Sequence, residues 1–154
     1  MVKWTKEILE KKGFKVSGAT IVTKAPQIDR NHFQFNLIPI PKPRMTRRDQ
    51  WLDPPRPGVA RYWAFKNEIN RQASKMGFTM PEDNFHVIFH IPMPKSWTGH
   101  RKDTMVGTKH QQTPDVDNLS KAVFDAICTQ DNFIWDCRIT KLWALEGKIE
   151  IIIK

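Results

Sequence analysis

"TPDVDNLSKAVFDAI", residues 113–127, predicts a helix at roughly 117–129 around which the rest of the fold is arranged. Its apolar side chains recur every three or four residues, which is typical of a helical face packed against a core. These side chains are Leu119, Ala122, Val123 and Ala126. The opposite face is polar and is expected to look outward, with Asp117, Lys121 and Asp125 along it.

Strand patterns lie on both sides of this helix. Two segments before it alternate apolar and polar side chains with the period of two that marks a half-buried strand. Two segments after it are joined through Glu146 and Gly147, which predicts a β-hairpin. The four predicted strands are residues 32–39, 85–91, 138–145 and 148–153.

A second helix is predicted between the first two strands. From Val59 to Met76 the apolar positions again recur every three or four residues, and Gly77 follows where a left-handed cap residue commonly ends a helix. The order is therefore strand, helix, strand, helix, strand, strand. It predicts a small α/β domain of mixed α+β type with a mixed four-stranded sheet.

The 154 residues fit one domain. We assign it to residues 32–154, and residues 1–31 to an N-terminal extension with a short helix at 4–12. The sequence lacks the run of about 18 apolar residues that a membrane span needs, and its start has no apolar signal-peptide core. We therefore expect a cytoplasmic protein that has no membrane partner.

The net charge of +9 predicts a polyanionic partner, and nucleic acid is the favoured one. Residues 1–112 carry 20 Lys and Arg against 9 Asp and Glu, whereas residues 113–154 carry 5 against 7. Two polar loops, 39–57 around Trp51 and 92–114 around Trp97, interleave basic residues with an aromatic side chain. We expect their basic side chains to bind DNA, the alternative being solvated surface loops. The candidates are Lys42, Arg44, Arg47, Arg48, Lys95, Arg101 and Lys102.

The acidic residues stand out against this basic background. In an extended segment Asp115 and Asp117 point to the same side, which suits a shared hard cation. Ligands that offer only oxygen favour Mg²⁺ or Mn²⁺, and Lys121 can stabilise the charge that develops on a reacting phosphate. The alternative is structural: Asp117 caps the helix and pairs with Lys121. Asp115 is required by neither of those structural roles.

The run "PDVDNLSKAVFDAI" followed by "FIWD" resembles the RusA-type Holliday junction resolvases, a family common in bacterial prophages. The family pattern has a proline, two aspartates flanking one residue, Asn-Leu and a lysine four positions after the second aspartate. An aromatic-rich segment that ends in a third aspartate follows. "PIPKPRMTRR" resembles the proline-basic stretch near the family's first strand, and "PMPKSWTGHRK" its basic loop before the aspartates. The similarity covers about residues 33–153.

The resemblance implies a homodimer in which each subunit uses Mg²⁺ to nick one strand of a four-way DNA junction, in DNA recombination and repair. By position it implies Asp115, Asp117 and Asp136 as metal ligands, with Lys121 as the catalytic lysine. Where the family often has two adjacent acids, Trp135 precedes Asp136 here, so Asp131 is the alternative third ligand.

Two other functions fit the same sequence. One is a non-catalytic, basic DNA-binding module whose acids serve only as caps and ion pairs. The other is an endonuclease with broader activity on flaps and other branched DNA. Asp125 receives no role in the site, and we expect it to support the helix surface.

Overall fold

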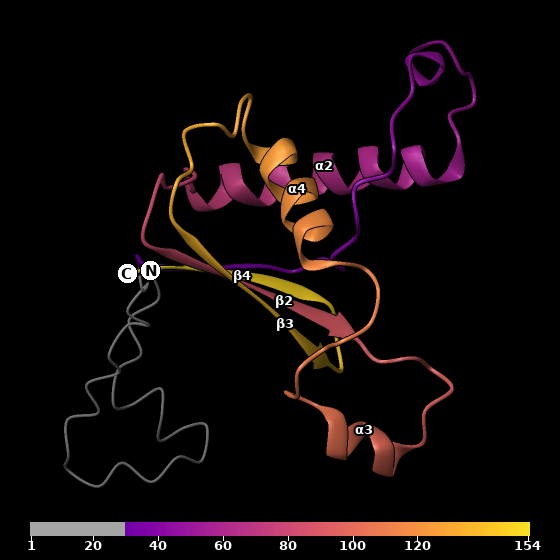
Figure 1. Ribbon diagram of the computed structural model, residues 1–154, viewed down its shortest axis with the longest axis vertical. Helices are drawn as coiled ribbons and strands as arrows, with labels where there is room; N and C mark the ends of the chain where they lie inside the picture. Colours follow the sequence, from indigo (N-terminus) through magenta and orange to yellow (C-terminus); the bar gives the residue numbers. More distant parts are fainter. Residues whose placement is uncertain (1–29) are drawn as a thin grey trace, which may run out of the picture.

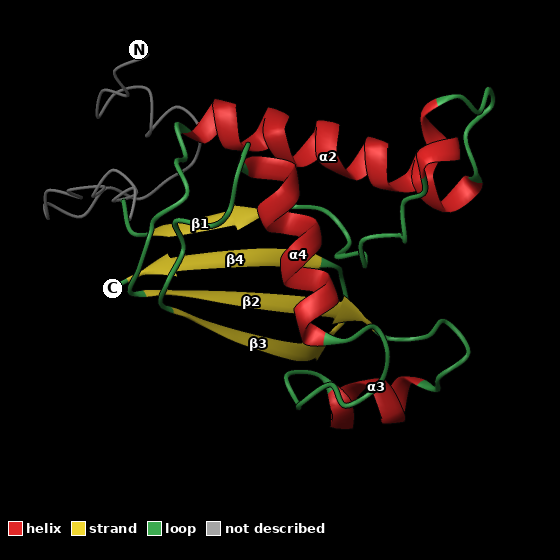
Figure 2. Ribbon diagram, turned by 45° about the horizontal axis from the view of Figure 1, so that its top comes forward, coloured by secondary structure: helices red, strands yellow, loops and turns green. Residues whose placement is uncertain are grey.

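The structure is a computed structural model that describes residues 30–154. The elements are β1 (His32–Phe35), the 3-10 helix η1 (Arg47–Gln50), α2 (Pro57–Met76), β2 (Phe85–Pro92), α3 (Gly99–Met105), α4 (Val116–Ile127), β3 (Cys137–Ala144) and β4 (Lys148–Ile153). The strands form one sheet, and α2 and α4 lie over the same face of it (Figures 1 and 2). The predicted mixed fold with a four-stranded sheet is confirmed, whereas the predicted helix at 4–12 lies outside the described residues.

The strand order in the sheet is β1-β4-β2-β3. β2 and β3 run parallel, while β4 runs antiparallel to both β1 and β2. The predicted hairpin between the last two strands is therefore wrong, because β2 lies between them. The turn at Glu146 and Gly147 carries the chain past β2, where Gly147 approaches Ile38 so closely that a Cβ would lie 2.8 Å from its Cα.

The core lies between the sheet and the two helices. Alternate side chains of β2 are buried there, as the period of two predicts. β4 contributes Ile149 and Ile151, and α4 contributes Leu119, all of them fully buried. From α2 the buried side chains are Val59, Tyr62, Phe65, Ile69 and Ala73.

Both predicted helices are present. α2 begins with Pro57 at its first position and ends at Gly77, whose φ of 66° is the left-handed conformation expected from the sequence. Asn70 joins α2 to α4, since its side-chain amide donates to the Ala126 carbonyl at 2.8 Å. None of the helices in the described part of the chain is long and apolar enough to cross a bilayer.

The region 92–114 departs from the prediction of an irregular loop. It contains α3, whose N-cap Thr98 accepts a hydrogen bond from the Arg101 backbone at 3.3 Å. The residues after α3 then run along the free edge of β3, where the backbone N–H of Gly107 donates to Trp143 and that of His110 to Lys141. The segment is thus held by a cap and by long-range backbone hydrogen bonds that sequence periodicity does not reveal.

We expect Ile151→Ala to lower the free energy of unfolding by about 2–5 kcal/mol, because it leaves a cavity in the core. Ile152→Ala removes the same atoms one position along β4, on the half-buried opposite face, and should cost less than half as much. Urea denaturation monitored by far-ultraviolet circular dichroism measures both values. Equal losses would contradict the assignment of the two faces.

Candidate active site

The two aspartates of the quoted motif lie at the start of α4. Asp115 is the N-cap residue, and its backbone carbonyl accepts a hydrogen bond from Leu119 at 3.1 Å, while Asp117 lies in the first turn. Both side chains are exposed. Neither carboxylate has a hydrogen bond or ion pair with any residue in the range 30–154. Both are therefore available to a ligand from outside the chain.

The structural alternative for these acids is not what the structure contains. Asp117 occupies the first turn rather than the cap, and its carboxylate does not bond to the helix backbone. Lys121 lies one turn farther along the exposed face, and no ion pair within the described residues joins it to Asp117. Two carboxylates and an ammonium group without partners in the described residues thus lie along the N-terminal half of α4.

A clamp from β3 holds the segment that leads into α4. The Lys141 ammonium donates to the carbonyl oxygens of Gln112 and Pro114, each at 2.7 Å. The main chain of Lys141 holds the same segment, because its carbonyl oxygen accepts a hydrogen bond from the His110 backbone N–H at 3.1 Å. Asp115 directly follows this clamped segment, so the clamp fixes where α4 begins. No sequence pattern singles out Lys141, because its partners are backbone carbonyls 27 and 29 positions away.

His110 forms the apolar support of this clamp. Its ring is buried and lies 4.2 Å from the Trp143 ring, centroid to centroid. Burial lowers the pKa of His110, and the nearby Lys141 charge lowers it further. The imidazole is therefore neutral at pH 7 and packs as an aromatic side chain beside the segment that carries the acids.

Asp136 lies apart from Asp115 and Asp117 within one chain. It directly precedes β3, and the rise of about 3.3 Å per strand residue separates it from Lys141 by about 16 Å. Asp131 is also distant, because it follows the far end of α4, whose 12 residues span about 18 Å. The described residues accordingly contain no group of three or more His, Cys, Asp or Glu that could hold a metal ion.

The fit to Mg²⁺ is therefore partial within one chain. Asp115 and Asp117 offer the two carboxylate oxygens that Mg²⁺ commonly takes from a protein, with waters and phosphate oxygens filling its other positions. The third ligand implied by the family pattern is not beside them in the same chain. The ligand set of Asp115, Asp117 and Asp136 stays a prediction.

Asp125 acquires a structural role. Its carboxylate pairs with the Lys42 ammonium at 2.5 Å, and the Lys42 backbone N–H donates to the Asn118 carbonyl at 3.4 Å. The proline-rich stretch is thereby attached to α4 next to the candidate site. Burial, followed by the Asp125 charge, raises the pKa of the neighbouring Tyr62 hydroxyl. The Lys42 ammonium, one of the predicted DNA ligands, thus has a carboxylate partner within the chain.

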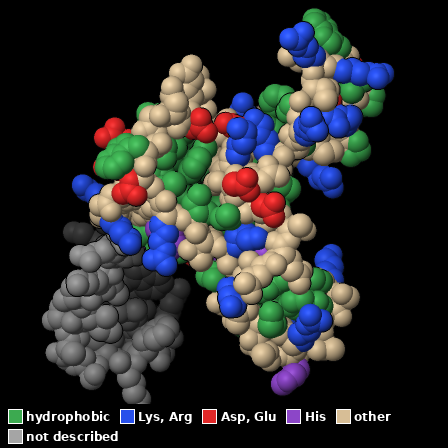
Figure 3. All heavy atoms as spheres, in the orientation of Figure 1, with side chains coloured by type: hydrophobic (Ala, Val, Ile, Leu, Met, Phe, Trp, Pro, Cys, Tyr) green, Lys and Arg blue, Asp and Glu red, His purple; other side chains and the backbone are tan. Residues whose placement is uncertain are grey.

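The other predicted DNA-binding side chains lie on two projections. Residues 42–56, which we call the arm, carry the exposed Arg44, Arg47 and Arg48. The segment around α3 carries the exposed Lys95 and Arg101 and the half-buried Lys102. In Figure 3, Lys and Arg side chains gather on both projections, and acidic side chains lie on the face between them.

The Arg101 guanidinium lies over the Trp97 ring, 3.9 Å from its centroid, and Trp97 in turn packs against Trp143. This cation–π contact holds the guanidinium against an aromatic face and leaves the side chain exposed. The second basic loop is therefore ordered around Trp97 rather than freely solvated.

One family model matches this chain. It is described as endodeoxyribonuclease RusA, and it matches residues 35–154. The match includes the whole sheet beyond the first part of β1, both long helices and every candidate site residue named above. No curated protein matches the chain significantly.

We expect Lys141→Met to release the segment before α4. A hydrogen bond to a charged donor contributes about 1.5–3 kcal/mol when buried, and the partial exposure of Lys141 reduces that value. Amide hydrogen exchange across residues 111–119 should therefore accelerate several-fold in this variant, as measured by mass spectrometry. Lys109→Met is the control, because that exposed side chain has no partner in the described chain. Unchanged exchange in Lys141→Met would show that the clamp does not fix the segment.

Proposed function

The chain belongs to the RusA family of Holliday junction resolving endodeoxyribonucleases, and we propose that it is a Mg²⁺-dependent enzyme that resolves four-way DNA junctions during recombination and repair. The observation that carries the metal-dependent reaction is the end of α4. There, Asp115, Asp117 and Lys121 are exposed and have no partner in the described residues. DNA and the enzyme meet in the cytoplasm in a bacterial or phage-infected cell.

The chemistry follows from the charges at this end of the helix. Mg²⁺, or Mn²⁺ in its place, would activate water and neutralise charge on the phosphodiester. Asp115 and Asp117 are proposed to hold the ion. Lys121, one helical turn beyond Asp117, is proposed to stabilise the negative charge that grows on the phosphate as the bond breaks. The basic projections on either side bind the DNA backbone, which would otherwise be repelled by the two carboxylates.

We further propose a homodimer with a site shared between subunits. Resolving a junction requires two symmetric nicks, and a two-fold dimer supplies two equivalent sites. Asp136 is about 16 Å along β3 from the clamp that precedes Asp115. β3 is the outermost strand of the sheet, and residues 107–110 run along its C-terminal half. At its other end, beside Asp136, the Trp135 side chain is 71% exposed. A second copy docked at this edge would bring the partner subunit's Asp136 to Asp115 and Asp117.

Asp117→Asn tests the enzyme assignment. We expect it to lower the rate of Mg²⁺-dependent nicking of a synthetic four-way junction by more than about 100-fold, since even groups that only orient a metal ligand contribute 10- to 100-fold. Junction affinity, measured by gel shift without divalent ions, should stay equal or tighten because a negative charge has been removed. Asp103→Asn makes the same charge change on α3 and should cut normally. Cutting by Asp117→Asn at the wild-type rate would overturn the assignment.

The same assay decides between the proposed function and the others. A non-catalytic DNA-binding module would show strongly salt-dependent binding and no metal-dependent cutting of any branched substrate. A general branched-DNA endonuclease would cut flaps and forks as fast as four-way junctions. We expect the four-way junction to be cut fastest in a panel of such substrates.

Mixing two inactive variants tests the shared site. If Asp136 acts within its own chain, a dimer of one Asp117→Asn and one Asp136→Asn subunit has a defect in both sites. If Asp136 acts across the dimer, the same mixed dimer has both defects in one site and none in the other. We therefore expect the mixture to nick one strand of each four-way junction again, without the second, symmetric nick.

The controls for this experiment come from the same chain. Each variant alone should be inactive, and the two must be refolded or co-expressed together so that subunits exchange. Repeating the mixture with Asp131→Asn in place of Asp136→Asn tests the alternative ligand. A mixture as inactive as its components would rule out the shared site while leaving the Asp117→Asn result intact.

A further inference from the structure

The arm extends from the body beyond the first turn of α2, as the ribbon and the space-filling view both show (Figures 1 and 3). It lies between β1 and α2 and contains η1 as its one helical turn in the described structure. At its base the arm is attached to the body through the Lys42–Asp125 ion pair and the Lys42 backbone hydrogen bond to Asn118, and the half-buried Met45 packs against the core. In the described structure the polar side-chain contacts of residues 46–56 lie within the arm. The shape of this outer part is therefore explained by those contacts.

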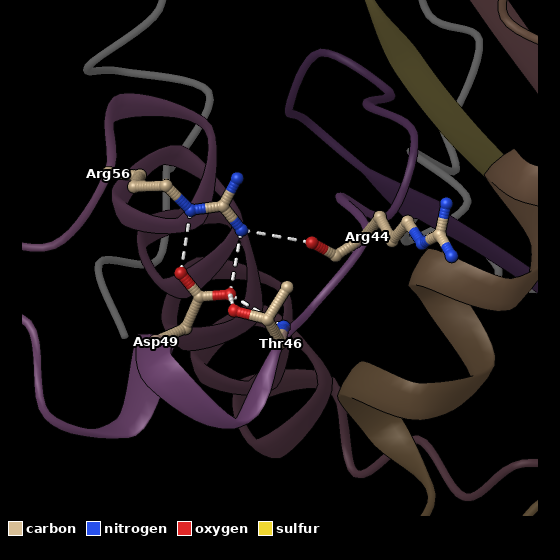
Figure 4. Close-up of polar contacts among 4 residues, drawn as sticks. All are labelled: Arg44, Thr46, Asp49 and Arg56. Carbon is tan, nitrogen blue, oxygen red and sulfur yellow. Dashed lines mark hydrogen bonds and ion pairs between the residues drawn. The ribbon is translucent and has the colours of Figure 1, made fainter.

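Four residues close the arm into a loop, and we call them the latch (Figure 4). The Asp49 carboxylate accepts two hydrogen bonds from the Arg56 guanidinium, at 2.6 and 2.7 Å. It also accepts from the backbone N–H and the hydroxyl of Thr46, at 2.6 and 3.0 Å. Arg56 completes the closure by donating to the Arg44 carbonyl at 3.0 Å. A bidentate pair of this kind fixes direction as well as distance.

The Asp49 carboxylate accepts four hydrogen bonds within the latch. The Asp49 side chain is only 6% exposed although it lies on a projecting loop. Its hydrogen bonds with Arg56, and then with Thr46, hold the pKa of Asp49 well below its usual range. The carboxylate is therefore charged at any working pH, and the two ends of the arm stay joined.

The arm carries an exposed aromatic ring as well as exposed cations. Trp51 follows η1 directly and is 83% exposed, the highest value among the large apolar side chains of the described residues. The side chains of Arg44, Arg47 and Arg48 are exposed and have no partner in the described chain. An exposed indole on a pre-shaped loop that also carries three exposed arginines lacks a structural explanation inside the domain.

We propose that the arm recognises the branch point of its DNA substrate, with Trp51 stacking on a base that the branch leaves unstacked and the three arginines binding the adjoining phosphates. This inference rests on the proposed function for the identity of the substrate. In continuous duplex DNA both faces of each base are covered by neighbouring bases, so an indole finds no free face. At a branch point the stack is interrupted, and an aromatic side chain can cover the exposed face.

The latch makes this recognition selective. Ordering a flexible, proline-containing loop on binding would oppose association, whereas a loop already closed by Asp49 and Arg56 loses little entropy. Arginine contacts to phosphate act on duplex and branched DNA alike. Discrimination for the branch point is therefore assigned to Trp51, and general affinity to Arg44, Arg47 and Arg48.

Trp51→Ala tests the assignment by comparing two substrates. Base–aromatic stacking contributes about 1–3 kcal/mol per base, so affinity for a four-way junction should fall about 5- to 150-fold. Affinity for a duplex of equal length should change less than about two-fold, since no free base face is available there. Fluorescence anisotropy in EDTA measures both affinities without cutting. Trp63→Ala, at a half-exposed tryptophan on α2, is the matched control and should change neither affinity.

A base analogue gives a direct readout of stacking. Wild-type protein should change the fluorescence of 2-aminopurine placed at the branch point, Trp51→Phe should retain the change and Trp51→Ala should lose it. Equal loss of affinity for junction and duplex in Trp51→Ala, or no loss at all, would overturn the proposal. Retention of the 2-aminopurine response in Trp51→Ala would overturn it as well.

Asp49→Asn tests the latch separately. This change makes the arm more positive, so electrostatics alone predicts tighter binding to every DNA. A positioning role predicts that the preference for junction over duplex decreases in spite of the added charge. These binding readouts do not depend on catalysis. If the protein binds junctions through Trp51 but does not cut them, the proposed enzyme is refuted and this inference stands. If the protein cuts junctions and Trp51→Ala changes nothing, this inference is refuted and the proposed enzyme stands.

Discussion

The parallel pairing of β2 with β3 is the constraint on which the rest of the structure depends. Parallel neighbours cannot be joined by a tight turn, so the chain must cross over the sheet between them. This crossover contains α3 and α4, and it brings the start of α4 toward the end of the sheet where β2 and β3 terminate (Figure 2). The Lys141 clamp is possible only because β3 lies beside that crossover. The position of the two aspartates thus follows from strand direction.

Local sequence patterns predicted the elements that carry a strong period. α2 and α4 have apolar stripes that pack on the sheet, and the core strand β2 alternates along its whole length. α3 could not be predicted in this way, because its seven residues include no buried side chain. The hairpin prediction failed for a related reason. The pattern of β4 is satisfied equally by pairing with β3 or with β1 and β2, and only the whole sheet decides which.

The residues of the candidate site also differ in whether a local sequence pattern could identify them. Asp115, Asp117 and Lys121 lie within seven positions of one another, so spacing alone could group them. Asp136 was reached through family resemblance, and its position at the far end of β3 explains why no local pattern could find it. The ion pair between Lys42 and Asp125 and the Lys141 clamp join segments far apart in the sequence. Such contacts depend on packing and leave no periodic trace in the chain.

Some carboxylates of the described residues have structural partners. Asp49 closes a loop through Arg56, Asp125 joins α4 to the arm through Lys42, and Glu150 contacts His32 of the neighbouring strand as well as Lys148. Asp115 and Asp117 are different from these three because they are exposed and unpaired two positions apart, although Lys121 lies one turn beyond Asp117. On a surface that attracts phosphate, two such charges would repel the ligand that the rest of the surface binds. A bound divalent cation converts that repulsion into attraction, so the same pair of acids that is unfavourable for simple DNA binding is favourable for cutting DNA.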